Sequence, residues 1–160
     1  MDFTKDTRVA IGSDHGGFEL KEIVKDHLLR LGYCVVDLGC HSPDPVDYPD
    51  IAFLVASAIA TNDDTAGIMV DGVGVASAMV GNKVPGVRAA PVYDVFSARS
   101  SREHNDANML TLGARVTGPG LACLVAEEWL VTPFGGGRHE RRVNKIRDIE
   151  ARFIRRVPLK

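Results

Sequence analysis

Short apolar runs alternate with longer amphipathic stretches along the whole chain. Five mostly apolar runs, each bounded by glycine or polar turn residues, predict buried strands over Val9–Gly12, Tyr33–Leu38, Gly67–Val70, Val87–Val92 and Asn108–Leu112. The other periodic stretches predict helices over Phe18–Leu31, Tyr48–Ala60, Val75–Val80, Tyr93–Arg102, Leu121–Leu130 and Arg138–Arg156. Strands that alternate with helices pair in parallel through right-handed crossovers. The pattern therefore predicts a single domain over residues 1–160, a Rossmann-like α/β/α sandwich with a five-stranded parallel sheet.

Residue spacing predicts which side of the first helix and of the last helix is buried. In the first helix, the spacing predicts an apolar face of Phe18, Ile23, Leu28 and Leu31, with Lys21, Lys25 and Asp26 in solvent. In the last helix, one side is strongly basic and the other carries a stripe of Val143, Ile146, Ile149, Phe153 and Ile154. This stripe suits a second subunit as well as it suits the helix's own sheet.

A tight glycine turn follows the third predicted strand. The strand stops at Asp71, the turn is Gly72-Val73-Gly74, and an apolar helix begins at Val75. Glycines let the backbone turn sharply and approach a ligand, and the free N–H groups at a helix start favour an anion. Asp71 would then stand beside an oxyanion-stabilising loop. An ordinary turn with Asp71 as a capping residue explains the pattern equally well, because a short Gly-x-Gly is a weak signal.

Composition narrows the class of protein. Of the 160 residues, 45% are hydrophobic and 25% are charged, the balance of a globular domain with a real core. The formal net charge of -2 argues against a nucleic-acid binder. The apolar runs are too short for a membrane span, and the polar start is unlike a signal peptide, so no membrane partner is expected. Cys34, Cys40 and Cys123 lack CxxC spacing, which favours free thiols in a reducing cytosol over disulfides or zinc.

Two pairs of polar residues stand near strand ends. Asp14 and His15 follow the first strand, where they could bind or polarise a sugar hydroxyl. A capping aspartate and a surface histidine would explain the same pair. His104 and Asn105 are placed in a polar loop before the fifth strand, and an imidazole there can move protons near neutral pH. Taken alone, His104 is better explained by a structural role.

Arginines supply the other candidates. Arg138 and Arg142 are four residues apart, so they share one helix face and could grip a phosphate. A solvated charged face is the simpler explanation of the same spacing. Arg88 and Arg115 are single arginines near strand ends and are open to both interpretations.

The motifs, taken in order, resemble one family. The chain resembles the B-type ribose-5-phosphate isomerases, which include subunits of galactose-6-phosphate isomerase. The resemblance runs from about Arg8 to Ile149, and it is specific because the motifs occur together. It rests on residues 12–21 (GSDHGGFELK), 47–49 (DYP), 72–75 (GVGV), 82–83 (NK), 86–88 (GVR), 104–108 (HNDAN), 112–115 (LGAR) and 136–139 (GGRH).

The resemblance implies an enzyme that interconverts an aldose phosphate and a ketose phosphate without a metal or an organic cofactor. It implies that Asp14 and His104 help to open the sugar ring. A base would then carry a proton between C1 and C2 through a cis-enediolate. Backbone N–H groups from Gly72 through Val73, Gly74 and Val75 to Ala76 would hold the enediolate oxygens.

The resemblance also implies how the substrate is bound and how the protein assembles. The phosphate would be bound by His15, Arg115, Arg138 and Arg142, and the sugar would be lined by Tyr48 and Asn105. In the family the site is shared between two subunits. A homodimer or homotetramer is therefore implied.

The chain departs from the family in the glycine turn. Members usually carry their base as a cysteine at the position of Asp71 or as a glutamate at the position of Ser77. A hydroxyl residue is also usual where this chain has Val73. Asp71 is the candidate base that remains, since a carboxylate can carry out this proton transfer. The substrate could be ribose 5-phosphate or a related tetrose or hexose phosphate.

Two other functions compete with an active isomerase. Loss of both usual bases would suit a non-catalytic sugar-phosphate-binding subunit that works with an unlike partner. A nucleotide-binding module would also place Gly-x-Gly after a strand, but Ser77 stands where the last glycine of Gly-x-Gly-x-x-Gly belongs.

Overall fold

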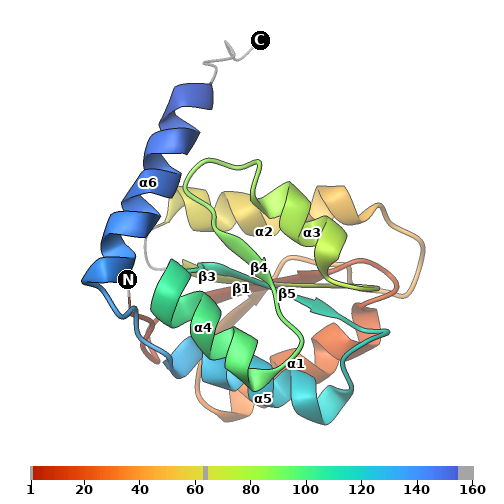
Figure 1. The fold of residues 1–160 in the computed structure, drawn as a ribbon. Coiled ribbons are helices and arrows are strands. Elements are labelled where there is room, and N and C mark those ends of the chain that lie inside the picture. The colour runs from red at the N-terminus through yellow and green to blue at the C-terminus, as the bar shows by residue number, and fades with distance from the viewer. Residues whose placement is uncertain (1, 63–64, 155–160) are drawn as a thin grey trace.

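Five parallel strands form one sheet in the order β2-β1-β3-β5-β4. The computed structural model describes residues 2–62 and 65–154 (Figure 1). The strands are β1 (Arg8–Ser13), β2 (Cys34–Asp37), β3 (Thr65–Asp71), β4 (Ala89–Pro91) and β5 (Met109–Gly113). The helices are α1 (Phe18–Arg30), α2 (Tyr48–Thr61), α3 (Val75–Gly81), α4 (Val95–Asn105), α5 (Pro119–Val131) and α6 (Arg138–Phe153). The predicted α/β/α sandwich is confirmed.

Helices cover both faces of the sheet. On one face, α1, α4 and α5 pack through a core that includes the fully buried Trp129. On the other face, α2 and α3 pack against residues that include Met69 and Met109 (Figure 1). Every residue of the central strand β3 is buried, as expected for a parallel strand covered on both sides.

The strand order creates a crevice between β1 and β3. The chain leaves β1 towards β2 on one side and later returns to β3 on the other side of β1. Ligands of open α/β sheets bind where the strand order reverses in this way, outside the carboxyl ends of the strands. Gly17 lets α1 start close to this point, because a Cβ there would lie 2.3 Å from the carbonyl oxygen of Val70.

The predicted faces of α1 are wrong at two positions. Lys21 is fully buried, whereas Ile23 is 40% exposed. The Nζ atom of Lys21 lies 2.7 Å from Asp37 Oδ2 and donates a hydrogen bond of 2.9 Å to the carbonyl oxygen of Cys40. Ion pairing makes the burial of this charge possible. Periodicity alone treats every lysine as solvent-facing, so it placed Lys21 on the wrong side.

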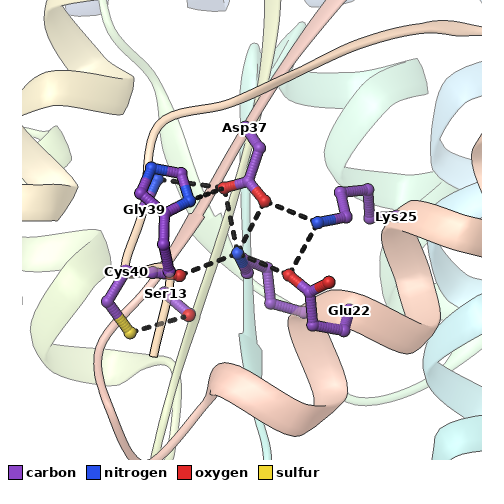
Figure 2. Close-up of polar contacts among 8 residues, drawn as sticks. Ser13, Glu22, Lys25, Asp37, Gly39 and Cys40 are labelled. Atoms are coloured by element: carbon purple, nitrogen blue, oxygen red, sulfur yellow. Dashed lines mark hydrogen bonds and ion pairs between the residues drawn. The ribbon is translucent and has the colours of Figure 1, made fainter. Parts of the chain in front are cut away.

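The same ion pairs fix the segment that follows β2. Lys25 lies 2.7 Å from Asp37 Oδ2 and 2.7 Å from Glu22 Oε1, and the Gly39 N–H donates to Asp37 at 3.0 Å (Figure 2). Burial by itself would raise the pKa of Asp37. The hydrogen bonds from Lys21, Lys25 and Gly39 outweigh it and hold this pKa at about 2. The loop between β2 and α2 is therefore tied to α1 through one carboxylate.

Helix α6 packs on α4, and the buried residues of α6 lie in its first two turns. His139 and Val143 are its buried residues, whereas Ile146, Ile149 and Phe153 are 46%, 56% and 78% exposed. The far end of the helix projects from the sandwich (Figure 1). Beyond Val143, the residues of the predicted apolar stripe are exposed in the single chain. The helix ends at Phe153, so its predicted extension is wrong at Ile154, and residues 155 and 156 lie outside the described residues. In the described part of the chain, no helix is both long and apolar enough to cross a membrane.

Replacing Asp37 tests the ion-pair cluster. Its pKa is lower in the folded protein than the ordinary 3.8, so its contribution is complete above about pH 4 and is lost as the pH falls towards 2. We expect Asp37→Asn to lower the free energy of unfolding at neutral pH by about 2–4 kcal/mol, with Lys21 left short of a partner. The difference from the wild type should shrink between about pH 4 and pH 2. Urea unfolding at several pH values measures it.

Asp26→Asn is the matched control, because Asp26 is an exposed carboxylate on the same helix. Its effect should stay within about 0.5 kcal/mol at every pH. An Asp37→Asn protein as stable as the wild type at neutral pH would contradict the role given to the cluster.

Candidate active site

Two aspartates stand at the carboxyl ends of the neighbouring strands β1 and β3. Asp14 follows β1, and its N–H donates to the carbonyl oxygen of Val70 in β3 at 3.2 Å. Asp71 is the last residue of β3. The half-buried Asp14 also accepts a 2.8 Å hydrogen bond from the Gly17 N–H, so its carboxylate helps to start α1. Both carboxylates lie where the strand order reverses.

The Asp71 carboxylate accepts four hydrogen bonds from the turn that follows it. Oδ1 accepts from the Val73 N–H at 2.7 Å and from the Gly74 N–H. Oδ2 accepts from the Ser77 N–H at 3.1 Å and from the Ser77 hydroxyl. The Asp71 residue is only 4% exposed. Gly74 has a φ of +86°, a conformation that favours glycine, and it places these donors around the carboxylate.

This arrangement decides how the N–H groups of the turn are used. The capping role of Asp71 is confirmed, because its carboxylate binds an N–H group in the first turn of α3. Val73 and Gly74 already donate to Asp71 and do not face an open anion site. The N–H groups of Val75 and Ala76 have no acceptor among the described residues. The Gly72 N–H likewise has no acceptor among the described residues, so three backbone donors near Asp71 are unoccupied in this part of the chain.

A groove of about 560 Å³ opens next to this edge of the sheet. His15, Arg115 and the start of α5 line it, and both side chains are exposed. The Arg115 N–H donates to the Gly72 carbonyl oxygen at 3.0 Å, so the groove continues from the glycine turn. His15 Nδ1 lies 3.2 Å from the Val46 carbonyl oxygen in the loop before α2. An imidazole and a guanidinium in one groove suit a phosphate group.

Tyr48 lies at the same end of the sheet, near the carboxyl ends of the strands. It is the first residue of α2 and follows the loop after β2. Tyr48 is 36% exposed, and it comes two residues after Val46, whose carbonyl oxygen lies 3.2 Å from His15 Nδ1.

The remaining candidates lie at the opposite edge. His104 and Asn105 are the last two residues of α4, so the predicted polar loop is wrong there. Helix α4 runs from the carboxyl end of β4 back to the start of β5, which carries both residues to the amino ends of the strands. Arg138 is the first residue of α6, and Arg142 is exposed one turn later. The Gly135 N–H donates to the Glu103 carbonyl oxygen at 2.9 Å, which joins the two helix ends.

His139 is a neighbour that sequence reasoning missed. Its ring stacks on that of His104 with centroids 4.3 Å apart and an interplanar angle of 7°. Burial lowers the pKa of His139, and the charges of His104, Arg138 and Arg142 lower it further. The two histidines are 35 positions apart in the sequence, so local spacing could not predict their contact, and the GGRH motif gave His139 no partner.

One copy of the chain does not bring the two groups of candidates together. Asp14, Asp71 and the groove lie at the carboxyl edge of the sheet, and His104 and Arg138 lie at the amino edge. Strand β5 alone spans five residues, and at about 3.3 Å per residue the edges are more than ~13 Å apart. Between residues 2–62 and 65–154, no three histidine, cysteine or acidic side chains come close enough together to hold a metal ion.

Comparison with known proteins agrees with the motifs. A model of the ribose/galactose isomerase family matches residues 9–146. The putative sugar phosphate isomerase YwlF of Bacillus subtilis is 44% identical over 92% of this chain and 99% of its own length. Ribose-5-phosphate isomerase B of Escherichia coli is 41% identical over 91% of this chain and 97% of its own.

A solved structure of a related protein has the same fold as this chain. Ribose-5-phosphate isomerase B of Clostridium thermocellum superposes with a TM-score of 0.89 at 47% identity, covering 92% of this chain and 99% of that one. Sequence and structure thus agree along nearly the whole length of both chains. The chain belongs to the ribose/galactose isomerase family, whose members interconvert aldose and ketose sugar phosphates.

Proposed function

We propose that the protein interconverts an aldose phosphate and a ketose phosphate through a cis-enediolate, with Asp71 as the base. One observation carries the proposal. The Asp71 carboxylate lies at the point where the strand order reverses, beside two helix-start N–H groups that have no acceptor in the described chain. A carboxylate next to oxyanion donors is the pairing that proton abstraction beside a carbonyl requires. Family membership supports the same reaction.

Each proposed residue has a step. Asp14 and His104 assist ring opening, and Asp71 then removes a proton from the carbon next to the carbonyl. The N–H groups of Val75 and Ala76 bind the enediolate oxygens, an electrostatic contribution often worth several kcal/mol. Asp71 finally returns the proton to the neighbouring carbon. The N–H groups of Val73 and Gly74 act indirectly, because they hold Asp71 in place.

The substrate is held through its phosphate and its hydroxyl groups. His15 and Arg115 share the groove beside the turn and bind the phosphate from one side. Two further guanidinium groups, those of Arg138 and Arg142, bind it from the other side. The sugar lies between Tyr48 and Asn105.

The protein works as a homodimer, or as a tetramer built from such dimers. A second copy places its amino edge against the carboxyl edge of the first and so supplies His104, Asn105, Arg138 and Arg142. Two observations support this assembly. The candidates of one chain lie at opposite edges of its sheet. The stripe on α6 leaves Ile149 and Phe153 exposed, which suits an apolar contact with another subunit.

The substrate is ribose 5-phosphate or a related tetrose or hexose phosphate. Val73, which is 47% exposed in the turn, brings an apolar side chain where relatives usually carry a hydroxyl group. If the substrate is ribose 5-phosphate, the reaction belongs to the pentose phosphate pathway. Three free cysteines support a cytoplasmic location. Relatives named as isomerases, matched over nearly their whole length, do not favour the non-catalytic subunit or the nucleotide-binding module.

Ketose formation tests the base. Wild type and Asp71→Asn are compared on ribose 5-phosphate, erythrose 4-phosphate, allose 6-phosphate and galactose 6-phosphate. We expect turnover of one of these by the wild type, and a loss of about 10²–10⁴-fold in Asp71→Asn because an amide cannot take up the proton. Asp71→Cys puts the family's usual base at this position and should recover part of the loss.

Asp94→Asn is the matched control, since Asp94 also accepts an N–H bond at a helix start, from Ser97 in α4. It should keep wild-type turnover. Hydrogen exchange at the Val73 and Gly74 amides shows whether the turn stays closed in each Asp71 variant. Full activity of Asp71→Asn would place the base elsewhere, and no wild-type turnover on any of the four sugars would overturn the proposed reaction.

Mixing two inactive variants tests the shared site. Asp71→Asn damages only the carboxyl-edge half of a site, and His104→Asn damages only the amino-edge half. Random pairing of the two chains makes half of the dimers mixed, each with one intact site, so about a quarter of wild-type activity should return. Activity after co-refolding of an equimolar mixture measures this.

Asp71→Asn mixed with Asp14→Asn is the control, because both changes fall in the same half and no intact site can form. Recovery in the control mixture, or none in the first one, would contradict a site shared in this way. A monomeric protein that turns over substrate would contradict it as well.

A further inference from the structure

The Ser77 hydroxyl is the donor to Asp71 that can rotate, although Ser77 itself is held in place. It is the third residue of α3 and is fully buried, with both its N–H and its hydroxyl directed at Asp71 Oδ2. A buried hydroxyl aimed at a carboxylate has few other ways to satisfy its hydrogen bonds. Its place relative to Asp71 is therefore as well defined as that of the backbone.

The backbone donors to Asp71 are fixed by the tertiary structure. The Thr111 hydroxyl donates to the Gly74 carbonyl oxygen at 2.6 Å, and the Arg115 N–H donates to the Gly72 carbonyl oxygen at 3.0 Å. The Ala114 N–H holds the carbonyl oxygen of Asp71 itself at 2.8 Å. Strand β5 and the loop after it thus fix the turn from one side. The N–H groups of Val73 and Gly74 cannot turn away from Oδ1.

A buried carboxylate that takes up a proton needs a hydrogen-bond acceptor for the new O–H group. An ionised carboxylate only accepts hydrogen bonds, and the oxygen that becomes protonated must donate one instead. Both donors to Oδ1 are backbone N–H groups, which have no acceptor capacity to offer. Oδ2 faces one backbone N–H and one hydroxyl. Only the hydroxyl, which carries lone pairs and rotates about its C–O bond, can change from donor to acceptor.

We infer that Ser77 is the positioning residue that makes Asp71 Oδ2 the proton-accepting atom, a role that rests on the proposed isomerase function. As the substrate C–H bond breaks, its electron pair enters the C=C bond of the enediolate and an O–H bond forms on Oδ2. The Ser77 hydroxyl turns and accepts a hydrogen bond from this new O–H. Its own O–H bond stays intact, and serine hydroxyls in helices can direct it to a carbonyl of the preceding turn. When Oδ2 returns the proton to the neighbouring carbon, the hydroxyl turns back.

This role gives a reason for the hydrogen bond between the Ser77 hydroxyl and the Asp71 carboxylate. A carboxylate that accepts four hydrogen bonds is held firmly but has little room to react. The rotating hydroxyl gives one oxygen that room without opening the turn. Asp71 and Ser77 therefore act as a unit, with Ser77 working through Asp71 and not on the substrate.

The kinetics of Ser77→Ala and Ser77→Thr test the inference. In Ser77→Ala, we expect kcat to fall about 10–100-fold while KM stays within about threefold, because substrate contacts are unchanged. The low-pH limb of kcat should move to higher pH, since the ionised carboxylate has lost a donor. Ser77→Thr keeps the hydroxyl and should restore kcat to within a few-fold of the wild type.

Ser101→Ala is the matched control, because Ser101 is a buried helical serine whose hydroxyl donates to the Ala98 carbonyl oxygen. It should change neither kcat nor its pH profile. Wild-type kcat and pH profile in Ser77→Ala would overturn the inference, and so would an equal loss in Ser77→Thr with both proteins folded. If Ser77→Ala unfolds, Ser77→Cys keeps the volume with a weak donor, and wild-type kcat in that variant overturns the inference instead.

The result separates the two proposals. An inactive Asp71→Asn beside an unaffected Ser77→Ala would leave Asp71 as the base and remove Ser77 from the reaction. An active Asp71→Asn would remove the base assignment and the role of Ser77 together.

Discussion

The contact between the Asp71 carboxylate and the turn that follows it organises the site. Buried polar groups have to be hydrogen-bonded, and here one side chain satisfies three backbone N–H groups and one hydroxyl at the end of the central strand. Without an anion inside the turn, these N–H groups would be buried without an acceptor, and the turn would be less stable. Because the chain supplies that anion itself, the N–H groups of Val73, Gly74 and Ser77 are occupied, whereas those of Val75 and Ala76 have no acceptor among the described residues.

The topology of the sheet imposes the second constraint. Because all strands are parallel, residues that follow strands and residues that precede them lie at opposite edges. Asp14 and Asp71 belong to the first kind, and His104 and Arg138 to the second. A small parallel sandwich cannot fold one edge onto the other. This separation is the reason for proposing that a second copy completes the site.

The buried ion pair of Lys21 and Asp37 fixes the loop that leads from β2 to the candidate site. It joins α1 to the segment after β2, and the same loop goes on to meet His15 through Val46. A buried charge with partners adds little net stability compared with an apolar pair of similar size, but breaking it is costly. The cluster therefore acts as a constraint on the loop, because any arrangement that pulls Asp37 away leaves an ammonium group stranded in the core.

The sequence by itself determined the layered fold, most of the element boundaries and the family. Alternating apolar runs of strand and helix period admit few other topologies, and the motifs occur in order along nearly the whole chain. It placed Asp71 at the end of a strand and beside a helix start for the same reason, since local spacing decides such neighbours.

Tertiary structure decided what local spacing cannot encode. Lys21 is buried because a carboxylate 16 positions away meets it in the core, and no periodicity of α1 contains that partner. His104 and His139 stack because α4 and α6 end and begin at the same edge of the sheet. Which N–H groups Asp71 binds depends on how β5 holds the turn. In each case a contact between distant segments supplied the energy that fixed the side chain, and such contacts exist only once the chain has folded.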